Sequence, residues 1–176
     1  DKRRAAAKIV QTLRAAGHEA YFVGGCVRDL ILKSKPKDFD IATSATPDRI
    51  EELFPKTLAI GKAFGVIVVR DGGESYEVAT FREDLAYKDG RRPEGVKFST
   101  AKADALRRDF TVNGLFYDPI SKKVLDWVGG QVDARKKVIR TIGKPLDRFQ
   151  EDKLRMLRAV RFAANLGFKI DPPTLK

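Results

Sequence analysis

Apolar side chains recur along this chain in two periods, and each period predicts a different element. In residues 5–16, AAAKIVQTLRAA, they lie three and four positions apart, which predicts a helix that ends at Gly17. The apolar run 20–23 predicts a buried strand, and residues 26–33 return to the helical period. This alternation indicates a chain that mixes helices and strands in one domain.

Capping and turn residues place the next elements. Thr46 followed by Pro47 is typical of a helix start, and we expect that helix to run to about Phe54. Two apolar runs, 65–70 and 75–81, predict strands, and the Asp-Gly-Gly between them is the signal of a hairpin.

The second half of the chain predicts a long loop, another hairpin and a helical end. Residues 82–100 are polar and contain Gly and Pro, so we expect a loop there. The pattern further predicts a helix at 102–108, a hairpin from 114–118 and 123–128, and a mostly helical stretch from about 129 to 167. We therefore expect a mixed α/β domain over residues 1–140 and the start of a helical domain over residues 141–176.

The charge of the chain points to a polyanionic partner. Lys and Arg number 35 against 24 Asp and Glu, which gives a net charge of +11. Nucleic acid is the first expectation, and a merely basic soluble protein is the alternative. The single cysteine, Cys26, excludes a disulfide framework, and the single histidine argues against a structural zinc site.

No targeting or membrane signal is visible in the sequence. No apolar run approaches the ~20 residues of a membrane span, and no signal peptide is apparent, so we expect a cytoplasmic protein without a membrane partner. The chain starts without methionine and stops at DPPTLK, where a helix could begin. We therefore expect the amino-terminal portion of a longer protein.

Two carboxylates stand side by side in the predicted strand 38–43, DFDIAT. Residues two apart on a strand share a face, so Asp38 and Asp40 would project together while Phe39 and Ile41 enter the core. Carboxylates this close repel each other, and a divalent cation removes the repulsion. Oxygen ligands suit Mg²⁺, and two such ions about 4 Å apart serve phosphoryl transfer. The alternative is a solvated strand end.

A glycine pair precedes these acids. Gly24 and Gly25 lie between a predicted strand and a predicted helix, where backbone N–H groups bind phosphate. Arg28 in the first helical turn adds a charge-assisted hydrogen bond. The pattern is neither a P-loop nor a Rossmann fingerprint. An ordinary tight turn and an Arg28–Asp29 surface ion pair are the alternatives, but beside the acids the turn indicates nucleoside triphosphate chemistry.

A set of motifs gives the chain a specific resemblance. They are GGCVRD, DFD, EVATFR, DGRRPEGVKF, RRDFTVNGLFYDP and EDKLRMLRAVRFAANLGF, in that order. With them the chain, from about residue 20 to residue 170, resembles the head and neck of the class II, bacterial-type tRNA nucleotidyltransferases and bacterial poly(A) polymerases. The resemblance implies an α+β fold: a polymerase β-like head with a small mixed sheet and helices, then an α-helical neck. The body and tail domains of that family would be absent.

The resemblance also implies residue roles. The catalytic acids would be Asp38, Asp40 and Glu77, with Asp38 and Asp40 as the metal ligands. The triphosphate would be held by Gly24, Gly25 and Arg28. Sugar and phosphate contacts would come from Arg108 and Asp109, supported by Asn113. A carboxylate that accepts a ribose hydroxyl distinguishes ribose from deoxyribose. The alternative for residues 107–109 is an ion-pair cluster at a helix end.

The last motif, EDKLRMLRAVRFAANLGF, contains the residues that the resemblance implies for selecting the base of the incoming nucleotide. Asp152 and Arg155 are three apart on a predicted helix and share a face. Asp accepts and Arg donates, which matches the amino group and ring nitrogen of both cytosine and adenine and rejects uracil and guanine. A helical salt bridge is the alternative. Arg158 and Arg161 continue the stripe toward phosphate. The apolar residues that we expect to pack the neck are Phe162, Leu166 and Phe168.

The function expected from the resemblance is addition of C and A, from CTP and ATP with Mg²⁺, to the 3′ ends of tRNA or another RNA. A poly(A) polymerase or an enzyme restricted to CC or A addition stays open, because GKAFGVIVV at 61–69 departs from the patterns of both subtypes. A non-catalytic RNA-binding module is the alternative from another class. The acids Asp38, Asp40 and Glu77 count against it.

Overall fold

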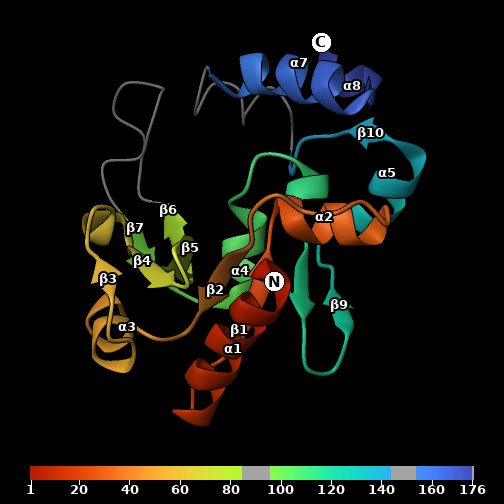
Figure 1. Ribbon diagram of the computed structural model, residues 1–176. Helices are drawn as coiled ribbons and strands as arrows, with labels where there is room; N and C mark the ends of the chain where they lie inside the picture. The colour runs from red at the N-terminus through yellow and green to blue at the C-terminus, as the bar shows by residue number, and fades with distance from the viewer. Residues whose placement is uncertain (85–95, 144–153, 176) are drawn as a thin grey trace.

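The computed structural model of the chain is built around one mixed sheet with helices on both faces (Figure 1). The structure describes residues 1–84, 96–143 and 154–175. The sheet has seven strands in the order β3-β4-β5-β2-β1-β8-β9. Its strands are β1 Ala20–Val23, β2 Asp40–Thr43, β3 Thr57–Leu58, β4 Val66–Asp71, β5 Glu74–Thr80, β8 Phe116–Asp118 and β9 Lys123–Leu125. The central pair β2 and β5 is parallel and the other pairs are antiparallel, which confirms the expected α+β class.

Among the described residues, the first helix and the helix over Leu154–Leu166 are long, and the other helices are short. They are α1 Lys2–Ala15, α2 Gly25–Ile31, α3 Pro47–Leu53, α4 Ala101–Leu106, α5 Gly130–Lys136, α7 Leu154–Leu166 and α8 Pro172–Leu175, with the 3₁₀ turns η1 Lys62–Phe64 and η2 Thr111–Asn113. In the part of the chain that the structure describes, no helix has the length and apolar character needed to cross a membrane.

The two faces of the sheet carry separate apolar clusters. Helices α1 and α3 cover one face, where Leu13 of α1 and Ile50 of α3 pack with Ile41 of β2. Helix α4 covers the other face, where its Ala105 packs with Phe116 of β8. Alternation along β2 and β5 assigns Asp40 and Glu77 to the α4 face, because their neighbours Ile41 and Val78 point to the α1 face. The acids therefore share a face with the segment that follows α4.

The local signals read from the sequence are confirmed in atomic detail. The hydroxyl of Thr46 accepts a hydrogen bond from the Arg49 backbone N–H at 3.3 Å and caps α3. The β4–β5 hairpin closes through Gly72 and Gly73, both with positive φ (58° and 80°). This two-residue turn with left-handed backbone is the one that matches strand twist.

The predicted loop 82–100 is wrong at both of its ends. Strands β6 Arg82–Asp84 and β7 Val96–Phe98 pair antiparallel there. They continue directly from the sheet, because the Phe81 N–H donates to Thr43 O and the Ser99 N–H donates to Phe81 O. The middle of that segment, residues 85–95, lies outside the described residues.

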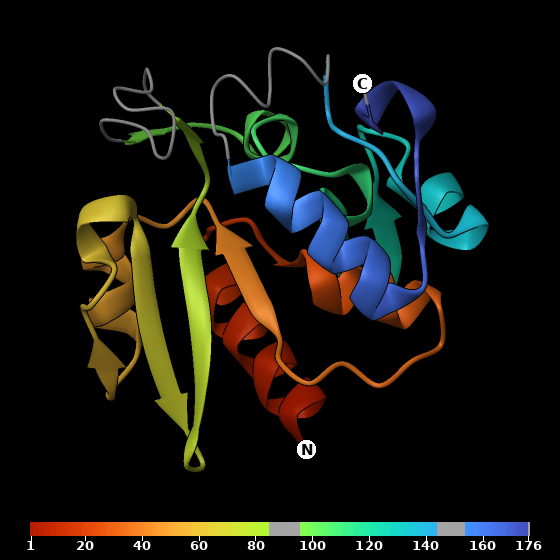
Figure 2. The same ribbon diagram turned by 90° about the horizontal axis from the view of Figure 1, so that it is seen from above.

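The predicted helical stretch after residue 129 is interrupted by extended chain. Helix α5 ends at Lys136, and the next residue, Lys137, has a left-handed backbone (φ 59°). Strand β10 Val138–Ile139 follows and pairs in parallel with β11 Lys169–Ile170. A pair of β-branched residues favours this extended backbone. Helix α7 packs over α2, through a cluster that joins Ala159 and Leu166 to Ile31 of α2 (Figure 2).

Candidate active site

The site is organised by the glycine turn between β1 and α2. Gly24 has φ 77° and ψ −139°, a backbone that a residue with a side chain rarely adopts. A Cβ at Gly24 would lie 3.7 Å from Nη1 of Arg108, and a Cβ at Gly25 would lie 3.2 Å from Nη2 of Arg28. Two guanidinium groups therefore stand beside a turn without side chains of its own, an arrangement suited to a polyphosphate.

Arg28 is held in place by two side chains. Its Nη1 donates to Oδ1 of Asn113 at 3.0 Å, and its Nε and Nη2 both donate to Oδ1 of Asp29 at 3.2 Å. The ion pair that we kept as the alternative is therefore present. It leaves Arg28 next to Gly25, so the pair orients the guanidinium at the turn. Asn113, expected to support Arg108 and Asp109, here binds Arg28.

Arg108 lies beside the same turn, next to Gly24. Its Nη2 and Nε donate to Oδ1 of Asp104 at 2.9 and 3.2 Å. The guanidinium carbon lies 5.6 Å from the centre of the Phe116 ring, within cation–π range. Asp104 is completely buried, and the sequence analysis missed it. The signal that could have found it is the four-residue spacing between Asp104 and Arg108 on a helix.

The acids come from the central parallel pair of strands. Ile41 pairs with Val78, so the preceding residues, Asp40 and Glu77, stand at matching positions on neighbouring strands. Both are exposed, while Phe39 and Ile41 are buried as expected. The expectation that strand alternation orients Asp38 is wrong, because β2 begins at Asp40. The carboxylate of Asp38 is 80% exposed and lies 3.7 Å from Nζ of Lys2.

Electrostatics joins these carboxylates. Although Asp40 has exposed surface, desolvation by the surrounding protein and the negative charge of Glu77 raise its pKa to about 6. The positive charge of Arg108 opposes this rise, and the negative charge of Asp38 adds to it. Such mutual repulsion is what a bound cation relieves. Within the described ranges, no group of three or more His, Cys, Asp or Glu side chains is already arranged around a metal position. The donor chemistry fits a hard divalent cation, and the carboxylates are not gathered into a finished site.

The residues expected at the neck differ in their contacts and in their burial. The carboxylate of Asp109 accepts a hydrogen bond from Nε of Arg158 on α7 at 3.0 Å and another from the Phe110 N–H. Arg155 is buried and Arg161 is exposed. Asp152 lies outside the described residues, so its pairing with Arg155 stays a prediction. The packing role of the neck aromatics is confirmed: Phe162 meets Phe110 edge to face at 5.9 Å, and Leu166 and Phe168 belong to the same cluster.

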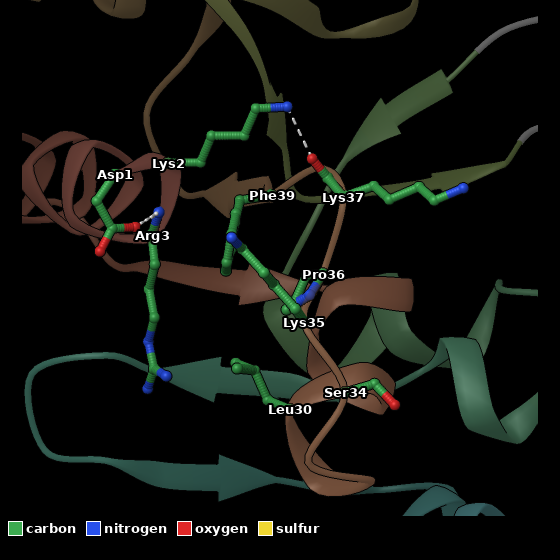
Figure 3. A pocket seen from close by; sticks show the side chains of 9 residues that line it. All are labelled: Asp1, Lys2, Arg3, Leu30, Ser34, Lys35, Pro36, Lys37 and Phe39. Carbon is green, nitrogen blue, oxygen red and sulfur yellow. Dashed lines mark hydrogen bonds between the residues drawn. The ribbon is translucent and has the colours of Figure 1, made fainter.

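A basic cavity of about 730 Å³ opens on another side of the head, between the start of α1 and the segment that follows α2 (Figure 3). Its walls carry the cations Lys2, Arg3, Lys35 and Lys37 around the apolar Leu30, Pro36 and Phe39. Nζ of Lys2 donates to the backbone carbonyl of Lys37 at 2.8 Å, which ties α1 to the residues just before β2. None of the residues expected at the active site lines this cavity.

Comparison with known proteins gives the chain its family. The family model described as the poly A polymerase head domain matches residues 20–140. The chain belongs to this poly A polymerase head-domain family. A curated relative, the CCA-adding enzyme of Oceanobacillus iheyensis, is 52% identical over 172 residues, which are 97% of this chain and 43% of that protein.

Solved structures support the same assignment for this head-domain family member. The crystal structure of Bacillus stearothermophilus CCA-adding enzyme in complex with CTP matches with TM-score 0.89 and 43% identity, over 97% of this chain and 41% of its own. A tRNA nucleotidyltransferase complexed with a primer tRNA and an incoming ATP analog matches with TM-score 0.76 and 31% identity, over 95% and 47%. The chain therefore spans less than half the length of the relatives that it matches.

Proposed function

We propose that this chain is the catalytic head and the start of the neck of an RNA nucleotidyltransferase that adds C and A, from CTP and ATP, to the 3′ end of tRNA. The observation that carries the proposal is the proximity of two features where β1 ends and β2 begins, since Val23 pairs with Asp40. These are a glycine turn beside the guanidinium groups of Arg28 and Arg108, and the acids Asp40 and Glu77 on adjacent strands. The identity to CCA-adding enzymes supports the substrates.

The triphosphate would lie at the glycine turn, with its negative charge against Arg28 and Arg108. As the 3′-hydroxyl of the RNA attacks the α-phosphorus, pyrophosphate leaves, and both guanidinium groups stabilise the charge that develops on it. Asp109 would accept the ribose hydroxyl, and its bond to Arg158 orients that carboxylate. Asp152 and Arg155 would read the base, with Arg161 toward phosphate.

Mg²⁺ is the metal that these donors favour. Asp38 and Asp40 would hold it, with Glu77 as the third carboxylate, since carboxylate oxygens with room for water and phosphate suit this ion. When bound, Mg²⁺ supplies a lowered pKa for the attacking hydroxyl and neutralises phosphate charge. Holding it requires the carboxylate of Asp38, now 3.7 Å from Lys2, to join Asp40.

A poly(A) polymerase is the second candidate, favoured by the description of the matching family model. An enzyme restricted to CC or A addition fits the same active site, and residues 61–69 leave these subtypes open. A non-catalytic RNA-binding module does not explain why Asp40 and Glu77 occupy matching positions against their mutual repulsion. A tRNA substrate would place the protein in the cytoplasm.

The deciding experiment uses a labelled tRNA that lacks its 3′ CCA, with Mg²⁺ and each nucleotide alone or CTP and ATP together. Products are read on a sequencing gel. CCA addition predicts incorporation of C from CTP alone and of a terminal A only after C. Long A tracts from ATP alone would establish the poly(A) activity instead. RNA binding without incorporation of any nucleotide would support the binding module.

A further inference from the structure

Asp104 is a buried carboxylate for which the reaction outlined above has no role. It lies on α4 with 0% of its surface exposed, and both of its oxygens are engaged. Oδ1 accepts hydrogen bonds from Nη2 and Nε of Arg108, at 2.9 and 3.2 Å. Oδ2 accepts the backbone N–H of Arg82 at 2.9 Å and lies 3.6 Å from Nε of Arg107. Burying a carboxylate charge costs free energy, which these hydrogen-bond donors offset. The carboxylate in turn holds the donor groups in place.

Asp104 determines which edge of Arg108 faces the glycine turn. Nε and Nη2 form one edge of the guanidinium plane, and Asp104 binds that edge. The Nη1 side then lies beside Gly24, 3.7 Å from the position of a Cβ. The Phe116 ring supports the flat face of the same group. The position and orientation of the guanidinium are therefore fixed before any phosphate binds, which lowers the entropy cost of binding.

The second oxygen of Asp104 joins this arginine to the sheet. Arg82 begins β6, and its backbone N–H has Asp104 as its acceptor. One carboxylate therefore sets the distance between the start of β6, the end of α4 and the glycine turn.

We infer that Asp104 is a positioning residue that orients Arg108 for the polyphosphate of the incoming nucleotide. It touches neither substrate nor metal and acts only through Arg108. The inference rests on the proposed function for the identity of the nucleotide. The contact itself requires only a polyphosphate at the glycine turn, so a simple anion can test it.

The test measures the Kd for inorganic tripolyphosphate by calorimetry, without divalent cations, so that no metal ion contributes to binding. Arg108→Gln should weaken binding about tenfold, the loss expected for a charge-assisted contact. Asp104→Asn keeps the volume and one acceptor, which can serve Arg82 or Arg108 but not both. It should weaken binding by a similar factor. The double variant should bind no more weakly than Arg108→Gln, because the two residues act as one unit.

Asp133 provides the matched control. It is a second buried carboxylate, bound to Nε of Arg140 at 3.2 Å and to the Thr111 hydroxyl at 2.6 Å. Asp133→Asn should lower the thermal unfolding midpoint about as much as Asp104→Asn while leaving the Kd for tripolyphosphate unchanged. A Kd that rises equally in both variants would mean general loosening and would overturn the inference.

Two further results would also overturn it. One is wild-type tripolyphosphate affinity in a folded Asp104→Asn protein. The other is a double variant whose loss of affinity equals the product of the two single losses. Failure to add C or A to tRNA would instead refute the proposed function and leave the tripolyphosphate comparison intact.

Discussion

Nε of Arg158, on helix α7, donates a 3.0 Å hydrogen bond to Oδ2 of Asp109, which lies at the end of the segment after α4. The residues are 49 positions apart, and the contact joins the two domains that we predict on either side of residue 140. Backbone hydrogen bonds reinforce this junction, from Thr111 N–H to Arg140 O and from Ile142 N–H to Asp109 O. A change in the neck can therefore reach the carboxylate that we propose for the ribose.

Arg158→Ala should impair sugar discrimination. Asp109 would keep its bond to the Phe110 N–H but lose its charged partner, at a cost of about 1 kcal/mol for a partly buried pair. We expect kcat/KM for CTP to fall more than kcat/KM for dCTP, measured on one RNA primer. Asn165→Ala, an exposed change on the same helix, is the control. An equal fall for both nucleotides would separate Arg158 from ribose recognition.

Asp40→Ala should abolish nucleotide incorporation in a protein that stays folded. The side chain is exposed on the sheet surface, so its removal leaves no cavity in the core. Loss of a metal ligand should cost several kcal/mol of transition-state stabilisation, or on the order of a thousandfold in rate. Circular dichroism checks the fold and primer extension the activity. Wild-type incorporation by this variant would refute the metal assignment.

Asp126→Ala should destabilise the chain at neutral pH and much less in acid. The carboxylate accepts four backbone N–H groups at the start of α5, from Val128, Gly129, Gly130 and Gln131. Burial alone would raise its pKa, but these donors hold the pKa below its ordinary value. We expect a loss of about 1–2 kcal/mol, as for a strong N-cap.

The pH dependence of this effect follows from the direction of the shift. A carboxylate with a lowered pKa in the folded state stabilises above the unfolded value of 3.8 and loses that contribution as pH falls through the folded value. Urea unfolding of wild type and Asp126→Ala between pH 7 and pH 3 measures it. The gap in unfolding free energy should be constant at neutral pH and shrink below about pH 4. A gap independent of pH would contradict a role for the ionised carboxylate.

Lys35→Glu with Lys37→Glu should weaken RNA binding and flatten its salt dependence. Both residues line the basic cavity beside α1, away from the glycine turn. For every phosphate that the variant no longer binds, the slope of log K against log salt should fall by about one. Filter binding from low to high salt gives the slope. Lys56→Glu with Lys123→Glu, at two exposed lysines that do not line the cavity, changes the net charge equally and is the matched control. An unchanged slope would exclude this cavity from the RNA interface.

Local signals predicted much of this fold because they act within a few residues. The Thr46 cap and the glycines at 72 and 73 each satisfy a backbone requirement that the neighbouring sequence already contains. The parallel pairing of β10 with β11 escaped prediction because its partners, Val138 and Lys169, lie far apart in the chain. Pairing across such a distance leaves no period in either segment.

The sequence predicted which types of residue form the candidate site better than it predicted the contacts among them. The glycine turn and Arg28 are encoded by neighbouring residues, and they stand together as expected. Asp104 was missed because a carboxylate at the start of a helix is ordinarily solvated, and only packing against β6 buries it. The contact of Lys2 with Asp38 was also missed, because the two residues lie far apart in the sequence and only the folded chain brings Nζ of Lys2 within 3.7 Å of the carboxylate.

The central position of the parallel pair β2 and β5 has a kinetic consequence. The β4–β5 and β8–β9 hairpins join segments adjacent in sequence, whereas Asp40 and Glu77 meet only when strands on either side of α3, η1 and β4 come together. Contacts that close a long loop form late, because the entropy of the loop opposes them first. The contact between Arg28 and Asn113 closes a longer loop still, because the two residues are 85 positions apart. Newly made protein would therefore form its acid pair before it gathered the groups that hold a polyphosphate.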